Sequence, residues 1–415
     1  MSARRPLYGW LTADAISLVG TRVSMIAIPW FVLTTTGSPT LTGLVALAEM
    51  LPLVVLKVLG GPVIDRVGAR RVAITCDLGS VVVVGAIPLL HGADLLAFPV
   101  LLALVAVAGG LRGPGDAAKH ALIPQLAATA EVPIERATGL SSTVERTATL
   151  LGAALAGALV TLVGAANALL VDAVSFGVAA AVLAWATVAM RPAGLVEEEE
   201  RDPAPYLVQL REGWDFLRRD PVLLAITVMV ALTNLLDAAW AAVLMPVWAK
   251  EYGAGAAGLG TVFAVFAGAS ALGSVCAAAW AARLPRFWVY LVAFLLAGAP
   301  RFAVFAYDSP AWLVGLVVVV GGFASGFLNP VLGAVIFERI PDPLLGRVSS
   351  LTTAMCWALM PFGGLLGGAL VSWQGLTFAM LATGAAYFLV TMLPAVDPRW
   401  REIDRRPEPA PSLVE

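Results

Sequence analysis

The chain carries little charge, almost no histidine and few cysteines. Only 13% of its 415 residues are charged, with two histidines and three cysteines, whereas ordinary globular proteins have about 25% charged residues. No Walker loop, hydrolase triad or spacing of metal ligands occurs, and Cys76, Cys276 and Cys356 lie inside apolar runs as small packing residues. These absences disfavour soluble enzymes, nucleic-acid binders and disulfide scaffolds. We therefore expect no enzymatic activity, no metal, no cofactor and no nucleic-acid partner.

What the sequence does have is hydrophobicity. Hydrophobic residues make up 60% of the chain, against roughly 45–50% in a globular protein. A transmembrane helix needs about 20 apolar residues, so twelve helices would use about 240 positions, which this composition supplies. We predict an all-α multi-pass membrane protein with twelve transmembrane helices. Apolar runs place them at 8–35, 41–64, 72–90, 96–118, 139–163, 166–190, 222–248, 256–281, 287–306, 311–337, 348–371 and 376–393.

One long charged segment separates the first six spans from the last six. Its later part, 206–219, spaces apolar residues at helical intervals, as in an amphipathic helix on the membrane surface. We predict a six-helix bundle over 1–190, a cytoplasmic linker over 191–220, a second six-helix bundle over 221–396 and a cytoplasmic tail over 397–415. The tail is polar and rich in proline after Pro398 and should be disordered there.

Basic residues predict the orientation. An even number of spans puts both termini and the linker on one side of the membrane. The loops on that side hold most of the arginines. The loops on the other side have almost no basic residues, and Lys250 is the clear exception. Because Lys and Arg accumulate in cytoplasmic loops, we expect both termini in the cytoplasm and the protein in the cell (inner) membrane. The apolar segment after Arg4 and Arg5 is too long for a signal peptide, so the first span should stay in the membrane.

The two halves also resemble each other. Residues 109–160 match 321–371 at an offset of about 211–212 residues, with Arg136 matching Arg347 and a shared closing Gly-Ala-Leu-Val. Halves with an even number of spans that repeat in this way have the same orientation, as parallel repeats do. The repeat therefore favours two matching bundles.

The loop after the second span reads G-P-V-I-D-R-V-G-A-R-R over 61–71. It predicts a tight turn, in which glycine permits left-handed geometry. The alternative is a basic loop that only sets the orientation in the membrane, but such a loop would not need Asp65 between glycines. The string is similar to the signature loop of the major facilitator superfamily, G-x-x-x-D-R-x-G-R-[KR], except that Ala69 replaces a basic residue. The resemblance implies a conformational latch made of Gly61, Asp65, Arg66, Gly68, Arg70 and Arg71. Asp65 would meet the helix N-terminus near 346–349, which stabilises a carboxylate by about 0.3–1 kcal/mol.

The first third resembles the drug:proton antiporter branch of that superfamily, which includes macrolide-efflux and enterobactin-exporter-like proteins. The resemblance is carried by residues 14–17, Gly20, 28–30, 36–38, Pro52, 121–124 and 172–176. It implies the major facilitator fold and proton-coupled efflux. The fifth-span signature of antiporters, G-P-x-x-G-G, lacks its proline here.

Glycines recur in the fifth and eleventh spans. They are Gly152, Gly157, Gly363, Gly364, Gly367 and Gly368. Glycines four apart let helix backbones approach closely, so packing alone accounts for them, and an added hinge role is the alternative. We expect these two spans to meet at the interface between the halves.

Charged residues inside spans are the strongest functional signal, because each costs about 2.5–3.5 kcal/mol at a helix centre. Glu49 is our first candidate for a proton-coupling site, since Arg22 lies at a similar depth and could pair with it. A permanently ionised pair that only fixes helix packing is the alternative. Asp14 and Asp237 are further candidates. By the resemblance, Asp172 and Arg301 lie on peripheral spans and should be structural.

By the same resemblance, the first, fourth, seventh and tenth spans line the central cavity. Aromatic, Met and Asn side chains of these spans, with two residues of the eleventh span, would contact the substrate, although ordinary packing is the alternative for each. They are Trp30, Phe31, Asn234, Trp240, Phe327, Asn329, Trp357 and Met360. Such side chains suit a large apolar or amphipathic ligand.

The sequence thus predicts a secondary active transporter that exports hydrophobic or amphipathic small molecules, of the multidrug or antibiotic type, by alternating access. Its partners would be the small-molecule substrate, protons and the lipid bilayer, and it would act as a monomer. A dedicated exporter of one endogenous metabolite (siderophore, antibiotic or lysolipid) is the alternative within transport. A membrane receptor or scaffold is a second alternative, but it would not need charged residues at the midplane.

Overall fold

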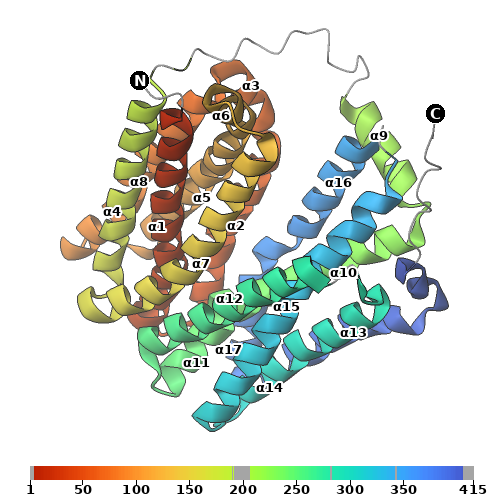
Figure 1. The fold of residues 1–415 in the computed structure, drawn as a ribbon. Helices are drawn as coiled ribbons and strands as arrows, with labels where there is room; N and C mark the ends of the chain where they lie inside the picture. Colours follow the sequence, from red (N-terminus) through yellow and green to blue (C-terminus); the bar gives the residue numbers. More distant parts are fainter. Residues whose placement is uncertain (1–3, 189, 191–205, 281–282, 342–343, 405–415) are drawn as a thin grey trace. The chain divides into compact units, whose positions relative to one another are not determined.

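The computed structural model of the chain describes residues 4–188, 190, 206–280, 283–341 and 344–404, and within these ranges every regular element is a helix (Figure 1). The α-helices of the first half are α1 (Arg5–Thr36), α2 (Pro39–Leu59), α3 (Gly61–Val67), α4 (Ala69–Gly92), α5 (Phe98–Ala121), α6 (Ile123–Ala130), α7 (Ile134–Val163) and α8 (Ala165–Ala186). Those of the second half are α9 (Tyr206–Leu217), α10 (Pro221–Ala239), α11 (Met245–Glu251), α12 (Gly255–Trp280), α13 (Arg286–Ala297), α14 (Ala299–Ala306), α15 (Ala311–Arg339), α16 (Leu345–Ala358) and α17 (Gly363–Met392). Short turns of other helix types are the π-helical η2 (Trp240–Leu244) and the 3-10 helices η5 (Met360–Phe362), η6 (Leu393–Val396) and η7 (Pro398–Asp404).

Eleven helical stretches of the described residues are long and apolar enough to cross a membrane. The last of them, Arg347–Val396, has 50 residues, whereas one crossing needs about 20. Its helix α17 contains the non-helical Gly375, whose φ is 81°. Glycine tolerates this left-handed backbone, so the stretch divides there into two spans. The predicted all-α architecture with twelve transmembrane helices is confirmed.

The link between the first two spans shows how local sequence ends one helix and starts the next. Gly37 ends α1 with a φ of 68°, and its N–H donates to the Leu33 carbonyl at 3.1 Å, a C-cap conformation that glycine adopts without strain. The Ser38 hydroxyl then caps α2 by accepting a hydrogen bond from the Leu41 N–H at 3.3 Å, with Pro39 in the first turn.

Contacts divide the chain into two compact units, and the first of them draws on both sequence halves. The first unit comprises Met1–Arg201, Asp237–Ala267 and Pro361–Ala379. The second comprises Asp202–Leu236, Gly268–Met360 and Met380–Glu415. The division of the sequence into two six-helix bundles with a linker between them stays a prediction.

In the first unit, α1 packs against α7 and α8, α4 packs against α5 and α8, and α2 packs against α5. Helices α1, α4 and α8 lie side by side in Figure 1. The end of this unit that holds the N-terminus contains an apolar cluster that includes Leu7, Trp10, Ile123 and Leu126. Polar side chains of these helices that point inward are therefore surrounded by apolar groups.

In the second unit, α13 packs against α15, α9 packs against α16, and η7 packs against α13. Leu217, Leu223, Ile340 and Val348 form a small apolar cluster there. The helix α9 forms within the predicted segment, with Leu217 at its end fully buried in this cluster and Trp214 42% exposed. Its place on the membrane surface stays a prediction.

The prediction of a disordered tail is wrong for residues 398–404. They form η7, because Trp400 and Ile403 are buried and give this short segment an apolar anchor. Residues 405–415 lie outside the described residues.

Candidate functional site

A buried ion pair joins two spans of the first unit near their middle. Arg112 Nη1 of α5 donates to Glu49 Oε1 of α2 at 2.7 Å, and the two side chains are 13% and 9% exposed. A single charge at a helix centre costs about 2.5–3.5 kcal/mol, and the opposite charge offsets much of that cost. Each partner therefore depends on the charge of the other.

Two glycines of α5 bring its backbone against α2. A methyl group added at Gly109 would overlap the carbonyl oxygen of Glu49, and one at Gly113 would come within 2.5 Å of the Leu53 carbonyl oxygen. Glycines four apart allow this kind of close approach between membrane helices. Arg112 lies between these two glycines in the sequence, so its guanidinium reaches the carboxylate of Glu49.

The predicted pairing of Arg22 with Glu49 is wrong. In the described part of the chain, the Glu49 carboxylate pairs with Arg112, while Arg22 Nη1 donates to Met25 Sδ at 3.4 Å. The prediction compared depths on the first two spans only, and it missed the close approach of α5. Arg22 still interacts electrostatically with Arg112, and its anionic neighbours are Glu145 and Asp116.

A second buried carboxylate of the first unit lies on α8. Asp172 of α8 is 1% exposed, the Ser24 hydroxyl donates a short hydrogen bond to its Oδ2, and the Ser175 hydroxyl donates to its Oδ1 at 3.3 Å. Gly20 makes room for this cluster, because a methyl group there would overlap Ser175. Asp172 interacts electrostatically with Arg112. These contacts are compatible with the structural role expected for Asp172.

Arg301, also expected to be structural, lies in the second unit. Its guanidinium carbon lies 4.9 Å from the ring centroid of Phe302 and 5.0 Å from that of Tyr387. Aromatic faces stabilise a guanidinium in this position.

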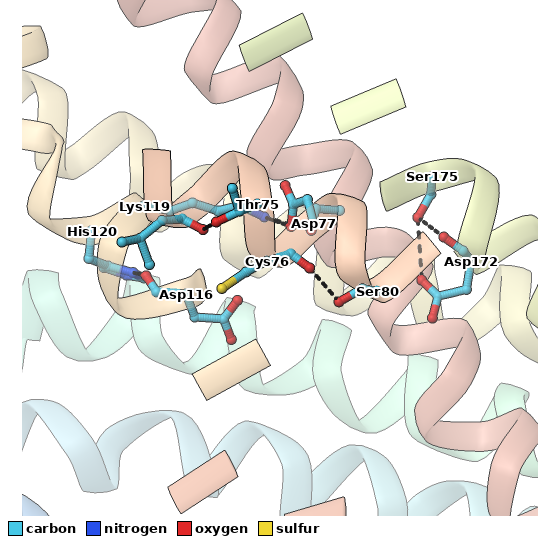
Figure 2. A network of polar contacts seen from close by, with 11 residues as sticks. Thr75, Cys76, Asp77, Ser80, Asp116, Lys119, His120, Asp172 and Ser175 are labelled. Carbon is cyan, nitrogen blue, oxygen red and sulfur yellow. Dashed lines mark hydrogen bonds and ion pairs between the residues drawn. The ribbon is translucent and has the colours of Figure 1, made fainter. Parts of the chain in front are cut away.

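A third buried charged group was missed by the sequence analysis. Lys119 Nζ of α5 donates to Asp77 Oδ1 of α4 at 2.9 Å and to the Ser17 hydroxyl of α1 at 2.8 Å, and Figure 2 shows Lys119 beside Asp77. Both ionic side chains are at most 5% exposed. Asp77 lay inside a predicted span, and its charge there was the available signal. Lys119 was assigned to a loop because the predicted span ended at 118, whereas α5 continues to Ala121.

The other two proton-coupling candidates differ in burial. Asp14 of α1 is 6% exposed and interacts electrostatically with Lys119. Asp237 is half-buried near the end of α10. Asp14 thus interacts with Lys119, Asp116, His120 and Glu145.

The predicted substrate-contact residues are distributed over both units. Of those in the first unit, Phe31 packs edge-on against His91 with ring centroids 4.9 Å apart, and Trp240, in η2, packs against Phe263 at 5.3 Å. Trp30 is half-buried. These aromatic contacts are those of packed side chains, so a role in substrate contact stays a prediction.

In the second unit, Asn234 Nδ2 donates to the Cys356 carbonyl at 2.9 Å, which joins α10 to α16. Phe327 packs against Phe323 with ring centroids 5.6 Å apart, and Asn329 is exposed. Trp357 and Met360 are half-buried.

The signature loop is not the tight turn that the sequence predicted. Gly61 starts the short helix α3, and Asp65 and Arg66 are exposed on it. Gly68, with a φ of 92°, separates α3 from α4, so the turn is confined to this glycine. Arg71 is exposed at the start of α4.

Arg70 of the signature loop has partners within its own unit. Its Nε donates to the Thr187 hydroxyl at 2.7 Å and its Nη2 donates to the Ala184 carbonyl at 3.1 Å. A cation is favourable at a helix C-terminus, so Arg70 fixes the end of α8 to the start of α4.

Glycines of the fifth and eleventh spans lie against spans of the other sequence half, as predicted, but they do not face each other. Gly157 of α7 lies against α12, where an added methyl group would come within 2.8 Å of the Ala256 carbonyl and 2.9 Å of Gly260. Gly364 of α17 lies against Gly43 of α2 instead. The fifth span therefore packs on the eighth, and the eleventh on the second, because each glycine faces another small residue.

The remaining glycines of the predicted set lie in contacts of the same kind. Gly152 faces the side-chain stem of Arg22, Gly367 faces Ala239, and Gly368 faces the backbone of Pro39. Gly363 is buried.

Comparisons with known proteins match nearly the whole chain. The Major Facilitator Superfamily matches residues 11–237 and 227–414. The chain is 28% identical over 410 residues to the multidrug efflux pump Tap of Mycobacterium bovis, which covers 98% of this chain and 97% of that protein. It is 27% identical over 406 residues to the multidrug efflux pump Tap of Mycolicibacterium fortuitum, with 97% of each chain covered.

Solved structures share the fold. The nucleoside transporter NupG superposes with a TM-score of 0.73 at 13% identity, covering 95% of this chain and 98% of that chain. A bacterial homologue of the iron transporter ferroportin gives a TM-score of 0.72 at 15% identity, covering 96% of this chain and 100% of that chain. At these identities the likeness shows the fold alone.

Proposed function

Since the chain belongs to the Major Facilitator Superfamily and is a multi-pass membrane transporter of small molecules, we propose that it exports hydrophobic or amphipathic compounds in exchange for protons. Two six-helix bundles alternate access to the substrate from the two sides of the membrane. The protein acts as a monomer in the cell membrane with both termini in the cytoplasm, which is the orientation that the arginine-rich loops favour.

The Glu49–Arg112 pair is the observation that carries the proton coupling. A proton on Glu49 removes the negative charge that offsets Arg112, whose distance to it is 2.7 Å. The guanidinium is then left in an apolar span, which favours any conformation that hydrates it or supplies another anion. Protonation and conformation are linked in this way, because a ligand shifts an equilibrium by its differential affinity for the two states.

The second guanidinium strengthens this coupling. Arg22 and Arg112 repel each other, so Arg112 depends all the more on its ion pair with Glu49. Asp172 stays held by two hydroxyls and does not need to change its charge. Of these two carboxylates, Glu49 is therefore the one whose protonation has the larger effect on Arg112, with which it forms an ion pair.

The substrate class is supported by the relatives, which are named multidrug efflux pumps and match this chain from end to end. It is also supported by the aromatic and Met side chains of the predicted contact set. An exporter of one endogenous metabolite would differ from this proposal in its range of substrates, because it would not transport unrelated cationic dyes.

Reconstituted protein in proteoliposomes tests the proposal. Uptake of a cationic dye under an imposed pH gradient is compared with dye–dye exchange without a gradient, for wild type, Glu49→Gln and the control Asp308→Asn, an exposed carboxylate in a loop. We expect Glu49→Gln to lose gradient-driven uptake and to keep exchange, and Asp308→Asn to behave as wild type. Gradient-driven uptake that survives Glu49→Gln would remove the assignment of Glu49. Wild-type uptake that ignores the gradient would remove the antiport mechanism.

A further inference from the structure

Two arginines of the first unit meet at the C-terminal end of α8. Arg5 Nη2, in the first turn of α1, donates to the Trp185 carbonyl at 2.7 Å. Arg70, in the first turn of α4, donates to the neighbouring Ala184 carbonyl and to the Thr187 hydroxyl. The start of α1 therefore lies beside the end of α8 (Figure 1). A helix C-terminus favours cations, so helix capping alone would account for these hydrogen bonds, but not for the surface on which Arg5 lies.

The Arg5 guanidinium lies on a face of α8 that is turned to lipid. Its carbon is 3.7 Å from the ring centroid of Trp185, and this indole side chain is 62% exposed. Val174, Val178 and Val188 are also exposed, and spacings of three, four and seven residues place them with Trp185 on one face of the helix. A contiguous exposed apolar face on a spanning helix is typical of contact with the membrane.

Aromatic residues indicate the depth of Arg5 in the bilayer. Tyr8, which follows Arg5 by three residues on α1, is exposed like Trp185. Tyr and Trp collect at the boundary between the hydrocarbon and the headgroups. Arg5 therefore lies at the level of the lipid phosphates, and its hydrogen bond and its stacking on the indole hold the guanidinium there.

Positive charge is in excess at this end of the first unit. The first turns of α1 and α4 and the residue before α1 hold four arginines, which are Arg4, Arg5, Arg70 and Arg71. The acidic residues of α1, α4 and α8 are Asp14, Asp77 and Asp172, and all three are buried further along their helices. Helix α3 adds one charge of each sign and α6 adds none. The ends of α1, α4 and α8 themselves carry no negative charge to neutralise the arginines.

We propose that this surface binds the phosphate headgroup of an anionic phospholipid, with the Arg5 guanidinium over Trp185 as the contact for the phosphate. Basic surfaces between transmembrane helices recognise anionic headgroups, and the exposed valine face of α8 accommodates an acyl chain. A zwitterionic phospholipid carries the same phosphate together with its own cation, so it gains less from the surrounding arginines. The site does not depend on the direction of transport or on proton coupling.

The chain contains one other group of matching charge. Glutamates 197–200 follow α8 in the sequence and lie outside the described residues. They match the charge of the arginines but have no use for the exposed valines and aromatic side chains beside Arg5. A phospholipid matches both the charge and the apolar surface.

Native mass spectrometry of the full-length protein in detergent tests the proposal, with phosphatidylglycerol as the anionic probe and phosphatidylcholine as the zwitterionic one. We expect wild type to bind phosphatidylglycerol more tightly. Arg5→Gln and Arg71→Gln should each bind it about fivefold more weakly, the loss typical of one basic residue at an anionic surface, and Arg5→Lys should keep most of the affinity. Arg283→Gln, which changes an exposed arginine of the second unit, is the matched control and should bind as wild type does. Equal binding of the two lipids by wild type, or an equal loss in Arg283→Gln, would overturn the proposal.

Further variants keep the test decisive if Arg5→Gln disturbs the end of α8. Arg71 is exposed, and its replacement removes neither the Arg5 nor the Arg70 hydrogen bonds. Trp185→Leu keeps an apolar side chain and removes the stacking, so it should weaken binding of phosphatidylglycerol and leave that of phosphatidylcholine unchanged. Replacement of glutamates 197–200 by glutamine should leave phosphatidylglycerol binding unchanged. A preference for phosphatidylglycerol that arises only after this replacement would show that the chain's own glutamates occupy the arginines, and the lipid site would then be wrong.

Discussion

Lys250 Nζ of α11 donates to the Leu33 carbonyl of α1 at 2.9 Å. Leu33 lies in the last turn of α1, and its carbonyl also accepts from Gly37 N–H. Both residues belong to the first unit. A cation at a helix C-terminus is favourable, so the one lysine that departs from the charge asymmetry of the loops has a structural explanation.

This contact predicts how Lys250 affects local unfolding at the C-terminal end of α1. Lys250→Met removes about 1 kcal/mol of helix-terminal stabilisation, which raises the population of the locally unfolded state, and with it the rate of amide exchange, about fivefold. Hydrogen–deuterium exchange of residues 33–42 measures it, and Lys250→Arg, which keeps the cation, is the matched control. Equal exchange rates in Lys250→Met and wild type would show that the hydrogen bond does not stabilise this end of α1.

The contact of Gly109 with α2 predicts that Gly109→Ala destabilises the protein, although alanine favours a helix more than glycine does. Gly109→Ala forces a methyl group onto the Glu49 carbonyl, and overpacking of this kind costs typically 1–3 kcal/mol. Gly139→Ala is the matched control, because Gly139 lies exposed in helix α7 with nothing within 4 Å of an added methyl group. Alanine there should be neutral or stabilising by up to about 1 kcal/mol. Thermal unfolding in detergent compares the two, and a Gly109→Ala protein as stable as Gly139→Ala would contradict the close packing of α2 and α5.

Most of the fold could be predicted from the sequence, because lengths of apolar runs and the composition of loops determine the spans directly. The partners of buried charges could not. Depth along one helix does not say which neighbour approaches, and the neighbour of Glu49 was decided by Gly109 and Gly113 on α5. Those glycines form a readable motif, with Arg112 between them.

Boundary errors of a few residues had a larger effect on the site than on the fold. Ending the fourth span at 118 removed Lys119 from the buried residues, and with it the partner of Asp77. The π-helical turn η2 was not predicted, because nothing in its sequence distinguishes it from an ordinary α-helix.

The Glu49–Arg112 pair predicts a coupling energy between its two members. Removing one partner of a buried pair leaves an uncompensated charge and costs about 3–5 kcal/mol, whereas removing both costs less. Arg112→Gln should therefore lower the free energy of unfolding more than Glu49→Gln with Arg112→Gln does. A double-mutant cycle measured by thermal unfolding checks this, with Arg22→Gln in place of Arg112→Gln as the comparison. Additive effects of Glu49→Gln and Arg112→Gln would show that the pair does not exist in the membrane.

The contacts of η7 predict which residues of the C-terminal tail are required for stability. Trp400 is 2% exposed and packs against Tyr290 with ring centroids 5.3 Å apart, and Asp404 Oδ1 accepts a hydrogen bond from the Phe287 N–H at 3.0 Å. Truncation after residue 404 keeps these contacts, and truncation after residue 397 removes them together with the buried Ile403. Because loss of a buried Trp side chain alone costs about 3–5 kcal/mol, we expect the shorter protein to unfold at a clearly lower temperature, and the longer one to match the full chain. Trp400→Ala in the full chain separates the apolar contact from chain length, and should reproduce most of the loss. If both truncated proteins unfold at the temperature of the full chain, η7 does not anchor α13.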